Sequence, residues 1–225
     1  MEPDRPVLLS FDIFGTVVDW RRGLTRALAG AGVPLARAEA AFDAIVDAQG
    51  RLEQASPGRS YRAIVADSVR HVMGLGARDA DAVADTVGRW PPFPDSAAAL
   101  VRLARIAPLV ALTNSDRDHG FAVRDAMPRV RWAHWLCAEE TGAYKPDPRV
   151  WDTCAARTGV PAGPAWWHIS AYADYDLEEG ARRGLTTVFV ERPHRCAGPA
   201  TLVVPDLAAL ADRLERDSES SRRPP

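Results

Sequence analysis

The sequence predicts an α/β fold in which helices cover both faces of a mainly parallel sheet, and in which a helical domain is inserted after the first strand. Three observations support this. The short run Val7–Phe11 is apolar and rich in branched residues, which is typical of a buried strand. The stretch 21–89 shows helical spacing of apolar residues and no strand pattern. From residue 96 onwards, strand-like runs alternate with helical segments, as parallel sheets require.

The boundaries of the inserted domain follow from composition. Residues 90–95 contain three prolines and cannot form a helix, so they are a suitable return point from the insertion. We therefore expect a core domain of residues 1–18 and 92–217 and a helical domain of residues 19–91. Within the insertion, the glycines and prolines at 30–34 and 56–58 predict breaks between helices. The polar residues 218–225 are expected to form a disordered tail.

The remaining elements of the core follow in order. We expect helices near 96–106, 119–127, 148–158 and 207–214, and one that ends near Gly184. Strands are expected at 109–113, 166–170, 186–190 and 201–204, with a short apolar stretch at 135–137.

Composition narrows the class of protein. The chain has 225 residues, of which 47% are hydrophobic, enough for one large domain or a core with an insertion. The net charge of -2 does not indicate binding to nucleic acid or to a membrane surface. The start has no apolar signal core, and no apolar run is long enough to span a bilayer. Cys137, Cys154 and Cys196 form no C-x-x-C pair, so we expect reduced thiols and a cytoplasmic protein.

Asp12 follows the first predicted strand, at the edge where ligands bind in open α/β sheets. A carboxylate at that edge can attack carbon or phosphorus and form a covalent intermediate. Gly15 allows a sharp turn, so that the amides of Ile13 and Phe14 can point at an anion beside Asp12. An isolated Asp at a strand end is more often a turn cap, so the rest of the chain has to decide.

Polar residues also follow the other predicted strands. Thr113 and Asn114 offer a hydroxyl and an amide, a pair that alone is a common helix cap. Lys145 lies in a loop stiffened by prolines, where it can neutralise a carboxylate nucleophile and an anionic substrate together. Asp174 and Asp176 can cap a helix, orient a water or bind a metal. In a doubly wound sheet these groups can converge on one crevice with Asp12.

Taken in order, these motifs resemble the haloacid dehalogenase superfamily of hydrolases. The matching motifs are Phe11–Thr16, Thr113–Asn114, Tyr144–Pro146, and Asp176 followed by Gly180 and Gly184. The resemblance implies a Rossmann-like core with a helical cap domain. Phosphatases of the superfamily carry a general-acid Asp where this chain has Phe14, and an acidic metal ligand where it has Ala171 and Tyr172. An aromatic residue at position 14 instead resembles the L-2-haloacid dehalogenase branch.

That branch implies a metal-independent hydrolase without a cofactor, acting on a small-molecule carboxylate. Asp12 would displace a leaving group from the carbon alpha to the carboxylate and form an ester, which water activated near Asp176 then cleaves. The amides of Ile13 and Phe14 would hold the substrate carboxylate or the oxyanion. The further residues assigned to the site by the resemblance are Thr16, Thr113, Asn114 and Lys145, which position the nucleophile and the substrate. A homodimer is a further implication.

Two positions depart from the branch. Its halide-binding Arg would fall near residues 42–44, where there is none, and its Ser and Asn before the last Asp are replaced by Ala171 and Ala173. Possible substitutes for the Arg are Arg37, Arg51, Arg59 and Arg62. Three alternatives therefore remain: a hydrolase that opens a small cyclic amino acid such as azetidine-2-carboxylate, with Asp174 or Asp176 facing the ammonium; a Mg-dependent small-molecule phosphatase; and a non-catalytic binding protein.

Several aromatic residues lie near these motifs. Trp20 falls where the chain leaves the nucleophile loop, where it would line the pocket. Tyr172 and Tyr175 lie at the expected active-site edge, where either can close the pocket or supply a polar contact. His168 lies within a predicted strand, and a buried, hydrogen-bonded imidazole is the favoured interpretation there. The five histidines have no metal-ligand spacing.

Overall fold

The computed structural model describes residues 5–193 and 198–220. Its centre is a six-stranded, fully parallel sheet, which confirms the predicted α/β fold. The strand order is β3-β2-β1-β4-β5-β6. The strands are β1 (Leu8–Phe11), β2 (Leu109–Thr113), β3 (Trp132–Cys137), β4 (Trp166–Ser170), β5 (Thr186–Val190) and β6 (Leu202–Val204).

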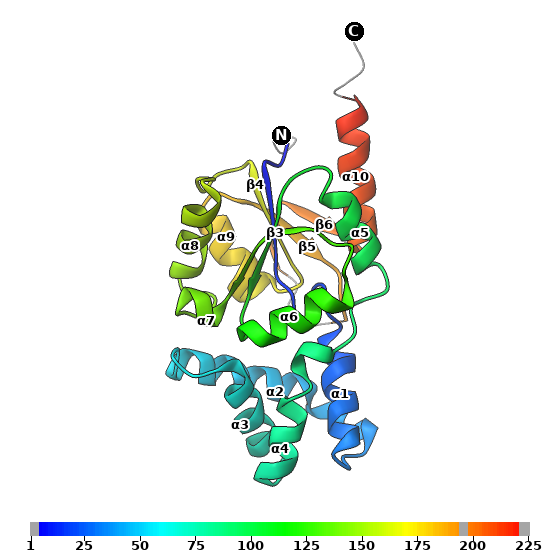
Figure 1. Cartoon of the computed structure of the whole chain (residues 1–225), viewed down its shortest axis with the longest axis vertical. Coiled ribbons are helices and arrows are strands. Elements are labelled where there is room, and N and C mark those ends of the chain that lie inside the picture. Colours follow the sequence, from blue (N-terminus) through cyan, green and yellow to red (C-terminus); the bar gives the residue numbers. More distant parts are fainter. Residues whose placement is uncertain (1–4, 194–197, 221–225) are drawn as a thin grey trace.

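Helices cover both faces of the sheet, and a group of helices lies below it in Figure 1. That lower group is formed by α1 (Trp20–Gly30), α2 (Leu35–Ala55), α3 (Tyr61–Met73), α4 (Ala77–Ala84) and the short η1 (Val87–Arg89). The helices of the sheet unit are α5 (Ser96–Leu103), α6 (Arg117–Ala126), α7 (Ala138–Thr141), α8 (Arg149–Thr158), the π-helix η2 (Ala173–Leu177), α9 (Glu178–Arg182) and α10 (Leu207–Ser220).

Alternation along the strands divides the core between the two faces of the sheet. Leu8 packs in the cluster that includes Trp151 of α8, whereas its neighbour Leu9 belongs to the cluster that includes Leu210 of α10. Successive side chains of a strand point to opposite faces, so a run that is buried throughout has to be apolar on both sides. This explains why these strands read as continuous apolar runs rather than alternating ones.

The lower helices, α1 to η1, are inserted between β1 and α5, and the two connecting segments run side by side. The amide of Asp19 donates to the carbonyl of Pro91 at 2.8 Å, and the amide of Phe93 donates to Val17 at 3.0 Å. The helices between these connections lie at the carboxyl ends of the strands (Figure 1). That position places them over the edge at which Asp12 and the other predicted site residues emerge.

Three details differ from the sequence-based expectations or lie beyond them. α10 continues to Ser220, so residues 218–220 are helical rather than disordered; the Ser218 hydroxyl donates to the carbonyl of Leu214 at 2.9 Å and extends the helical pattern. Residues 221–225 lie outside the described residues. β3 begins three residues before the expected apolar stretch, and α7 was not expected at all.

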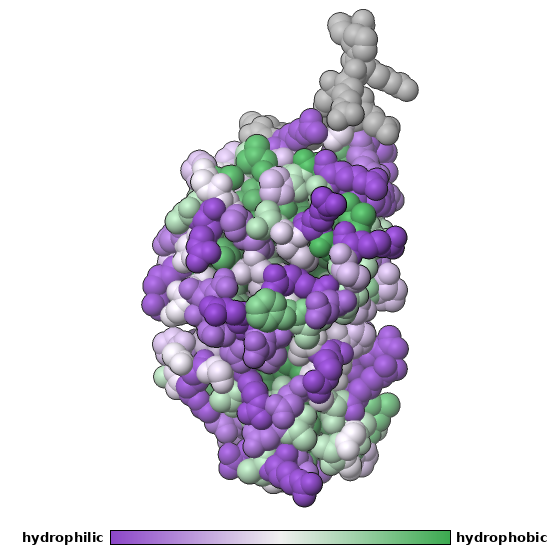
Figure 2. All heavy atoms as spheres, in the orientation of Figure 1, coloured by the Kyte–Doolittle hydropathy of each residue, from purple (hydrophilic) through white to green (hydrophobic). Residues whose placement is uncertain are grey.

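The visible surface is largely polar, and the two described cysteines are buried. The face shown in Figure 2 is mostly hydrophilic, with small hydrophobic areas between the charged groups. Cys137 and Cys154 are buried free thiols, and Cys196 lies outside the described residues. Among the residues that the structure describes, no helix combines the length and apolarity needed to cross a bilayer.

Candidate active site

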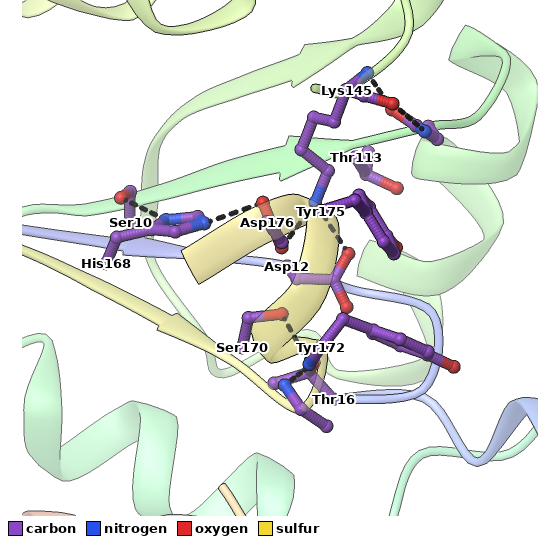
Figure 3. A network of polar contacts seen from close by, with 12 residues as sticks. Ser10, Asp12, Thr16, Thr113, Lys145, His168, Ser170, Tyr172, Tyr175 and Asp176 are labelled. Carbon is purple, nitrogen blue, oxygen red and sulfur yellow. Dashed lines mark hydrogen bonds and ion pairs between the residues drawn. The ribbon is translucent and has the colours of Figure 1, made fainter. Parts of the chain in front are cut away.

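The carboxyl ends of the central strands bring the predicted residues together (Figure 3). Asp12 directly follows β1, Asn114 directly follows β2, and Asp176 lies in η2 just after β4. Lys145 comes from the loop between α7 and α8. Asp12, Asn114 and Lys145 line a cavity of about 370 Å³, whereas Asp176 lies fully buried behind it.

Lys145 lies between the two carboxylates. Its Nζ donates to Asp12 Oδ1 at 2.9 Å and to Asp176 Oδ2 at 2.8 Å. Asp12 and Lys145 are each only 3% exposed, and Asp176 is not exposed at all. The ammonium thus holds both carboxylates close together where water is largely excluded. Because there is little water, the charge of Lys145 is poorly screened.

The two remaining carboxylate oxygens are also hydrogen bonded. The Thr16 hydroxyl donates to Asp12 Oδ2 at 2.7 Å, and in turn accepts the amide of Ala171 at 2.9 Å. Asp176 Oδ1 contacts His168 Nε2 at 2.9 Å. All four carboxylate oxygens therefore have a hydrogen-bond partner supplied by the protein, and Thr16 fixes the orientation of the Asp12 side chain.

The pKa values of the two acids shift in opposite directions, although both acids contact the same cation. Burial raises the pKa of Asp12, and the attraction of Lys145 offsets only part of that rise. Burial also acts on Asp176, but Lys145 and His168 outweigh it and hold the pKa of Asp176 well below its usual range. Burial alone would lower the pKa of Lys145, yet the two neighbouring carboxylates raise it overall. These shifts favour the charged forms of both Lys145 and Asp176.

His168 extends the network into the sheet. Its Nδ1 lies 2.8 Å from the Ser10 hydroxyl, which also accepts the indole N–H of Trp166 at 2.7 Å. Ser10 and His168 are directly paired in the register of β1 and β4. The prediction of a buried, hydrogen-bonded imidazole is confirmed, but its partner Asp176 was not foreseen. The sequence signal for this network was the presence of one polar residue, Ser10 or His168, within each of two mostly apolar strands.

The nucleophile loop presents free amides beside Asp12. Gly15 has φ of +98°, a conformation that L side chains rarely adopt, and an added Cβ would lie 2.6 Å from Cε2 of Tyr172. Ile13 and Phe14 are buried, and among the described residues no acceptor is found for their backbone N–H groups. Buried unpaired amides are costly unless a ligand accepts from them. The turn therefore has the form expected of an anion site.

Asn114 connects the sheet to the helices below. Its Oδ1 accepts the amide of Lys145 at 2.7 Å, and its Nδ2 donates both to the carbonyl of Lys145 at 3.2 Å and to Glu53 Oε2 at 2.9 Å. Asn114 thereby holds the backbone that carries the Lys145 side chain. Thr113 lines the cavity, but its hydroxyl lies 3.4 Å from Ser115 and no contact with Asp12 is found among the described residues.

On the helical side of the cavity, the sequence predicts Trp20 and the candidate Arg51, but not Gln49 or Glu53. This side is formed largely by α2, from which Gln49 and Glu53 reach the cavity. Gln49 Oε1 accepts the phenol of Tyr61 at 2.8 Å, and its Nε2 has no partner among the described residues. A helix reveals its buried stripe through apolar spacing, so polar residues next to that stripe give no signal of their own.

The four candidate substitutes for the missing Arg lie in different parts of the helical group. Arg51 lines the cavity. The other three are engaged away from it: Arg37 donates to the carbonyl of Met73, Arg59 pairs with Asp67, and Arg62 pairs with Asp85. Within the described chain, Arg51 is thus the one member of this set on the cavity wall.

The remaining predicted substrate-binding residues lie around the same cavity. Trp20, Tyr172 and Asp174 all line it. The rings of Trp20 and Tyr172 are 6.1 Å apart, and the buried indole N–H of Trp20 has no partner among the described residues. Asp174 is exposed at the rim, where it accepts the amide of Tyr175 at 2.9 Å. In the part of the chain that the structure describes, no group of three or more His, Cys, Asp or Glu is arranged to hold a metal ion.

Comparison with solved structures shows the same fold in several hydrolases. The chain is similar to the defluorinating L-2-haloacid dehalogenase Rha0230, with a TM-score of 0.79 and 22% identity over 95% of this chain and 100% of that chain. It is similar to the L-2-haloacid dehalogenase from Xanthobacter autotrophicus with chloropropionic acid covalently bound, with a TM-score of 0.80 and 17% identity over 94% and 98% of the two chains. The HAD-hydrolase YfnB from Bacillus subtilis, bound to magnesium, gives a TM-score of 0.77 and 18% identity over 94% and 99%.

A comparison with curated proteins gives no match. A family model, by contrast, matches residues 8–167, which include β1, all the lower helices, the strands β2 and β3, and the start of β4. The model describes a haloacid dehalogenase-like hydrolase. Because it matches well over half of the sequence, it assigns the family directly. The chain belongs to the haloacid dehalogenase-like hydrolases.

Proposed function

We propose that this protein is a metal-independent hydrolase in which Asp12 displaces a leaving group from the carbon alpha to a carboxylate. The observation that carries the proposal is the position of the Lys145 ammonium between Asp12 and Asp176. A divalent cation bridging these acids would have to displace a buried ammonium from both of them. The fixed cation favours the ionised form of Asp12 against the effect of burial, and an ionised carboxylate is the nucleophilic form.

The carboxylate of the substrate has a suitable place beside the nucleophile. Among the described residues, no acceptor is found for the backbone amides of Ile13 and Phe14, which directly follow Asp12, or for the indole N–H of Trp20, and both Phe14 and Trp20 line the cavity. Donors held rigidly beside the reacting atoms need not reorganise during the reaction, which is why such groups lower barriers effectively. The lower helices act as a cap in this proposal, because α2 forms the opposite wall and separates the ester from bulk water.

Hydrolysis of the ester completes the cycle. Water attacks the carbonyl carbon of the Asp12 ester, releases a 2-hydroxy acid and restores the carboxylate. Asp176 is fully buried and is held ionised by Lys145 and His168, so we assign it to anchoring Lys145 rather than to taking the water proton itself.

A second candidate is the opening of a small cyclic amino acid by the same attack. Acidic side chains on the cavity wall favour it, since Asp47 and Asp174 line the cavity alongside Arg51. A substrate with an ammonium group would balance these charges. The phosphatase alternative is less well supported. Phe14 lines the cavity where the phosphatases carry their general-acid Asp, and it cannot transfer a proton.

The test compares the wild type with Asp12→Asn in the presence of EDTA, using 2-chloropropionate, azetidine-2-carboxylate and a set of phosphate monoesters. We expect turnover of a 2-substituted carboxylate that EDTA does not reduce and that Asp12→Asn abolishes. Asp79→Asn, the same change at an exposed position in the first turn of α4, is the control and should behave as wild type. Phosphate ester hydrolysis that EDTA abolishes would replace the proposal with the phosphatase, and full turnover by Asp12→Asn would exclude the mechanism.

A further inference from the structure

Glu53 places a carboxyl group on the helical wall of the cavity, opposite the nucleophile loop. It lies near the end of α2, and its side chain contacts Asn114 across the boundary between the two groups of helices. Among the described residues it forms no ion pair, although Lys145 and Asp12 are near enough to act on its charge. Glu53 is partly buried, and burying a carboxylate without a cationic partner costs free energy.

The hydrogen bonds of Asn114 decide which oxygen of Glu53 carries a proton. Asn114 Oδ1 has to accept the amide of Lys145, since an N–H cannot bond to the amide nitrogen. Its Nδ2 therefore faces Glu53, and Oε2 is an acceptor. The acidic proton of Glu53 is then carried by Oε1, the oxygen that Asn114 leaves free.

Glu53 retains this proton at neutral pH. Burial raises its pKa to about 8, and the hydrogen bond from Asn114 and the charge of Lys145 offset only part of the rise. Below that pH the protonated form predominates. Among the described residues, the ionisable groups that interact with Glu53 include Asp12, Lys145, Tyr61, Tyr144 and Tyr175, and the charged groups Asp47, Arg51 and Asp174 line the same cavity.

We propose that Glu53 protonates the leaving atom of the substrate, and that the preferred substrates are 2-substituted carboxylates that lose oxygen or nitrogen rather than halide. This rests on the proposed function, because the leaving group departs as Asp12 attacks. An alkoxide or amide ion is a poor leaving group and needs a proton as its bond to carbon breaks, whereas a halide ion needs none. A wall that offers a carboxylic acid, with no Arg at 42–44, suits the first kind of leaving group.

The proton and electron balance closes without a further reagent. Asp12 forms a C–O bond to the alpha carbon, the bond from that carbon to the leaving oxygen or nitrogen breaks, and its electron pair takes the proton of Glu53. Glu53 is then a carboxylate. In the second step water adds to the Asp12 carbonyl carbon, the ester C–O bond breaks towards the 2-hydroxy acid, and the proton released restores Glu53.

The experiment measures ester formation on Asp12 in a single turnover, by intact-protein mass spectrometry, with oxirane-2-carboxylate and with 2-chloropropionate. In the first, the bond from the alpha carbon to the ring oxygen must break and that oxygen stays on the neighbouring carbon, whereas the second loses chloride. Glu53→Gln keeps an acceptor for Asn114 but has no proton to transfer. We expect it to slow the oxirane reaction by about 100-fold and to leave the chloride reaction within about threefold of wild type. Glu39→Gln, the same change at an exposed position of α2, should alter neither reaction.

The pH dependence provides a second readout. With oxirane-2-carboxylate the wild-type rate should fall as the pH rises through about 8, because Glu53 loses its proton there, and Glu53→Gln should lack that descent. The chloride reaction of the wild type should lack it as well.

Three results would overturn the inference: an equal loss on both substrates, no loss on either, or a wild type that forms the ester from 2-chloropropionate but not from the oxirane. A wild type that forms no ester from either compound would instead show that the proposed function itself is wrong. The chloride reaction also reports whether Glu53→Gln is folded, since an unfolded variant would lose both reactions and also its helical circular dichroism.

Discussion

At the scale of single residues, the chemistry of the site depends on two acids that share one cation. Asp12 and Asp176 are two buried acids, and Lys145 is the one cation between them. His168 helps to keep Asp176 ionised, so the imbalance falls on Asp12, whose pKa burial raises. A nucleophile whose ionisation is less favourable than usual is also less solvated, and it gains reactivity if the neighbouring cation keeps it charged.

This balance predicts opposite effects for two substitutions. Lys145→Met removes the attraction that lowers the pKa of Asp12, so the acid limb of the pH–rate profile for ester formation should move to higher pH. Asp176→Asn removes a repulsion, so the same limb should move to lower pH. The measurement is the pH dependence of single-turnover ester formation.

The direction in which each variant moves the acid limb is the decisive readout. A variant that only disturbed the structure would lower the rate without moving that limb. Lys145→Met should also destabilise the protein by roughly 3–5 kcal/mol, since it leaves two buried carboxylates facing each other. If both variants shift the limb in the same direction, Lys145 and Asp176 do not set the charge of Asp12.

Gly15 predicts a local stability effect. Gly15→Ala would force an L side chain into φ of +98° and against the ring of Tyr172, so we expect a loss of about 3 kcal/mol in the free energy of unfolding, with loss of ester formation. Gly32→Ala is the matched control: φ there is +84°, but a Cβ would meet nothing within 4 Å, so about 1 kcal/mol is expected. Urea unfolding gives both values, and equal losses would contradict the role of the Tyr172 contact.

At the scale of elements, α3 is attached to the sheet unit through its first turn. Asp116, at the start of α6, accepts the amides of Tyr61 and Arg62 at 2.7 and 2.8 Å. The phenol of Tyr144 also donates to the carbonyl of Arg59 at 2.7 Å. A carboxylate at a helix N-terminus satisfies free amides and the helix dipole. Here that carboxylate comes from the other side of the cavity and therefore helps to hold the cavity closed.

Asp116→Asn tests this attachment. An amide accepts these two N–H groups more weakly than a carboxylate and with one oxygen only, so we expect amide hydrogen exchange at the start of α3 to accelerate and kcat/KM to fall about tenfold. Ser60→Ala is the control, because Ser60 caps α3 through Ala63 without reaching the sheet unit. It should accelerate exchange while leaving kcat/KM within about twofold. If the two variants affect kcat/KM equally, the contact has no role beyond capping α3.

Elements could be predicted from sequence to different degrees. Strands such as β2 and β4 are mostly apolar and are buried throughout, so both could be located from the sequence. The four-residue α7 is too short to show any period. Near the chain end, polar composition suggested disorder from residue 218, although α10 includes residues 218–220, where the Ser218 hydroxyl donates to the carbonyl of Leu214.

At the scale of the whole molecule, the two walls of the cavity also differ in how far the sequence predicts them. Asp12, Asn114 and Asp176 could be brought together from the sequence because the carboxyl ends of parallel strands meet at one edge. Glu53 could not, because its place depends on how α2 packs across the sheet edge, and no local pattern encodes that. The wall predicted from sequence holds the nucleophile, and the wall seen only in the structure holds the group assigned to the leaving atom.

The covalent step at Asp12 is the central claim, and isotope labelling tests it most directly. Excess enzyme is allowed one turnover of 2-chloropropionate in H₂¹⁸O, and both the product and the peptide that contains Asp12 are analysed by mass spectrometry. If Asp12 forms the ester and water cleaves it at the carbonyl carbon, the first turnover places ¹⁸O in the Asp12 carboxylate and none in the 2-hydroxy acid. Label in the 2-hydroxy acid, with an unlabelled Asp12, would show that water attacks the substrate directly and would contradict the account.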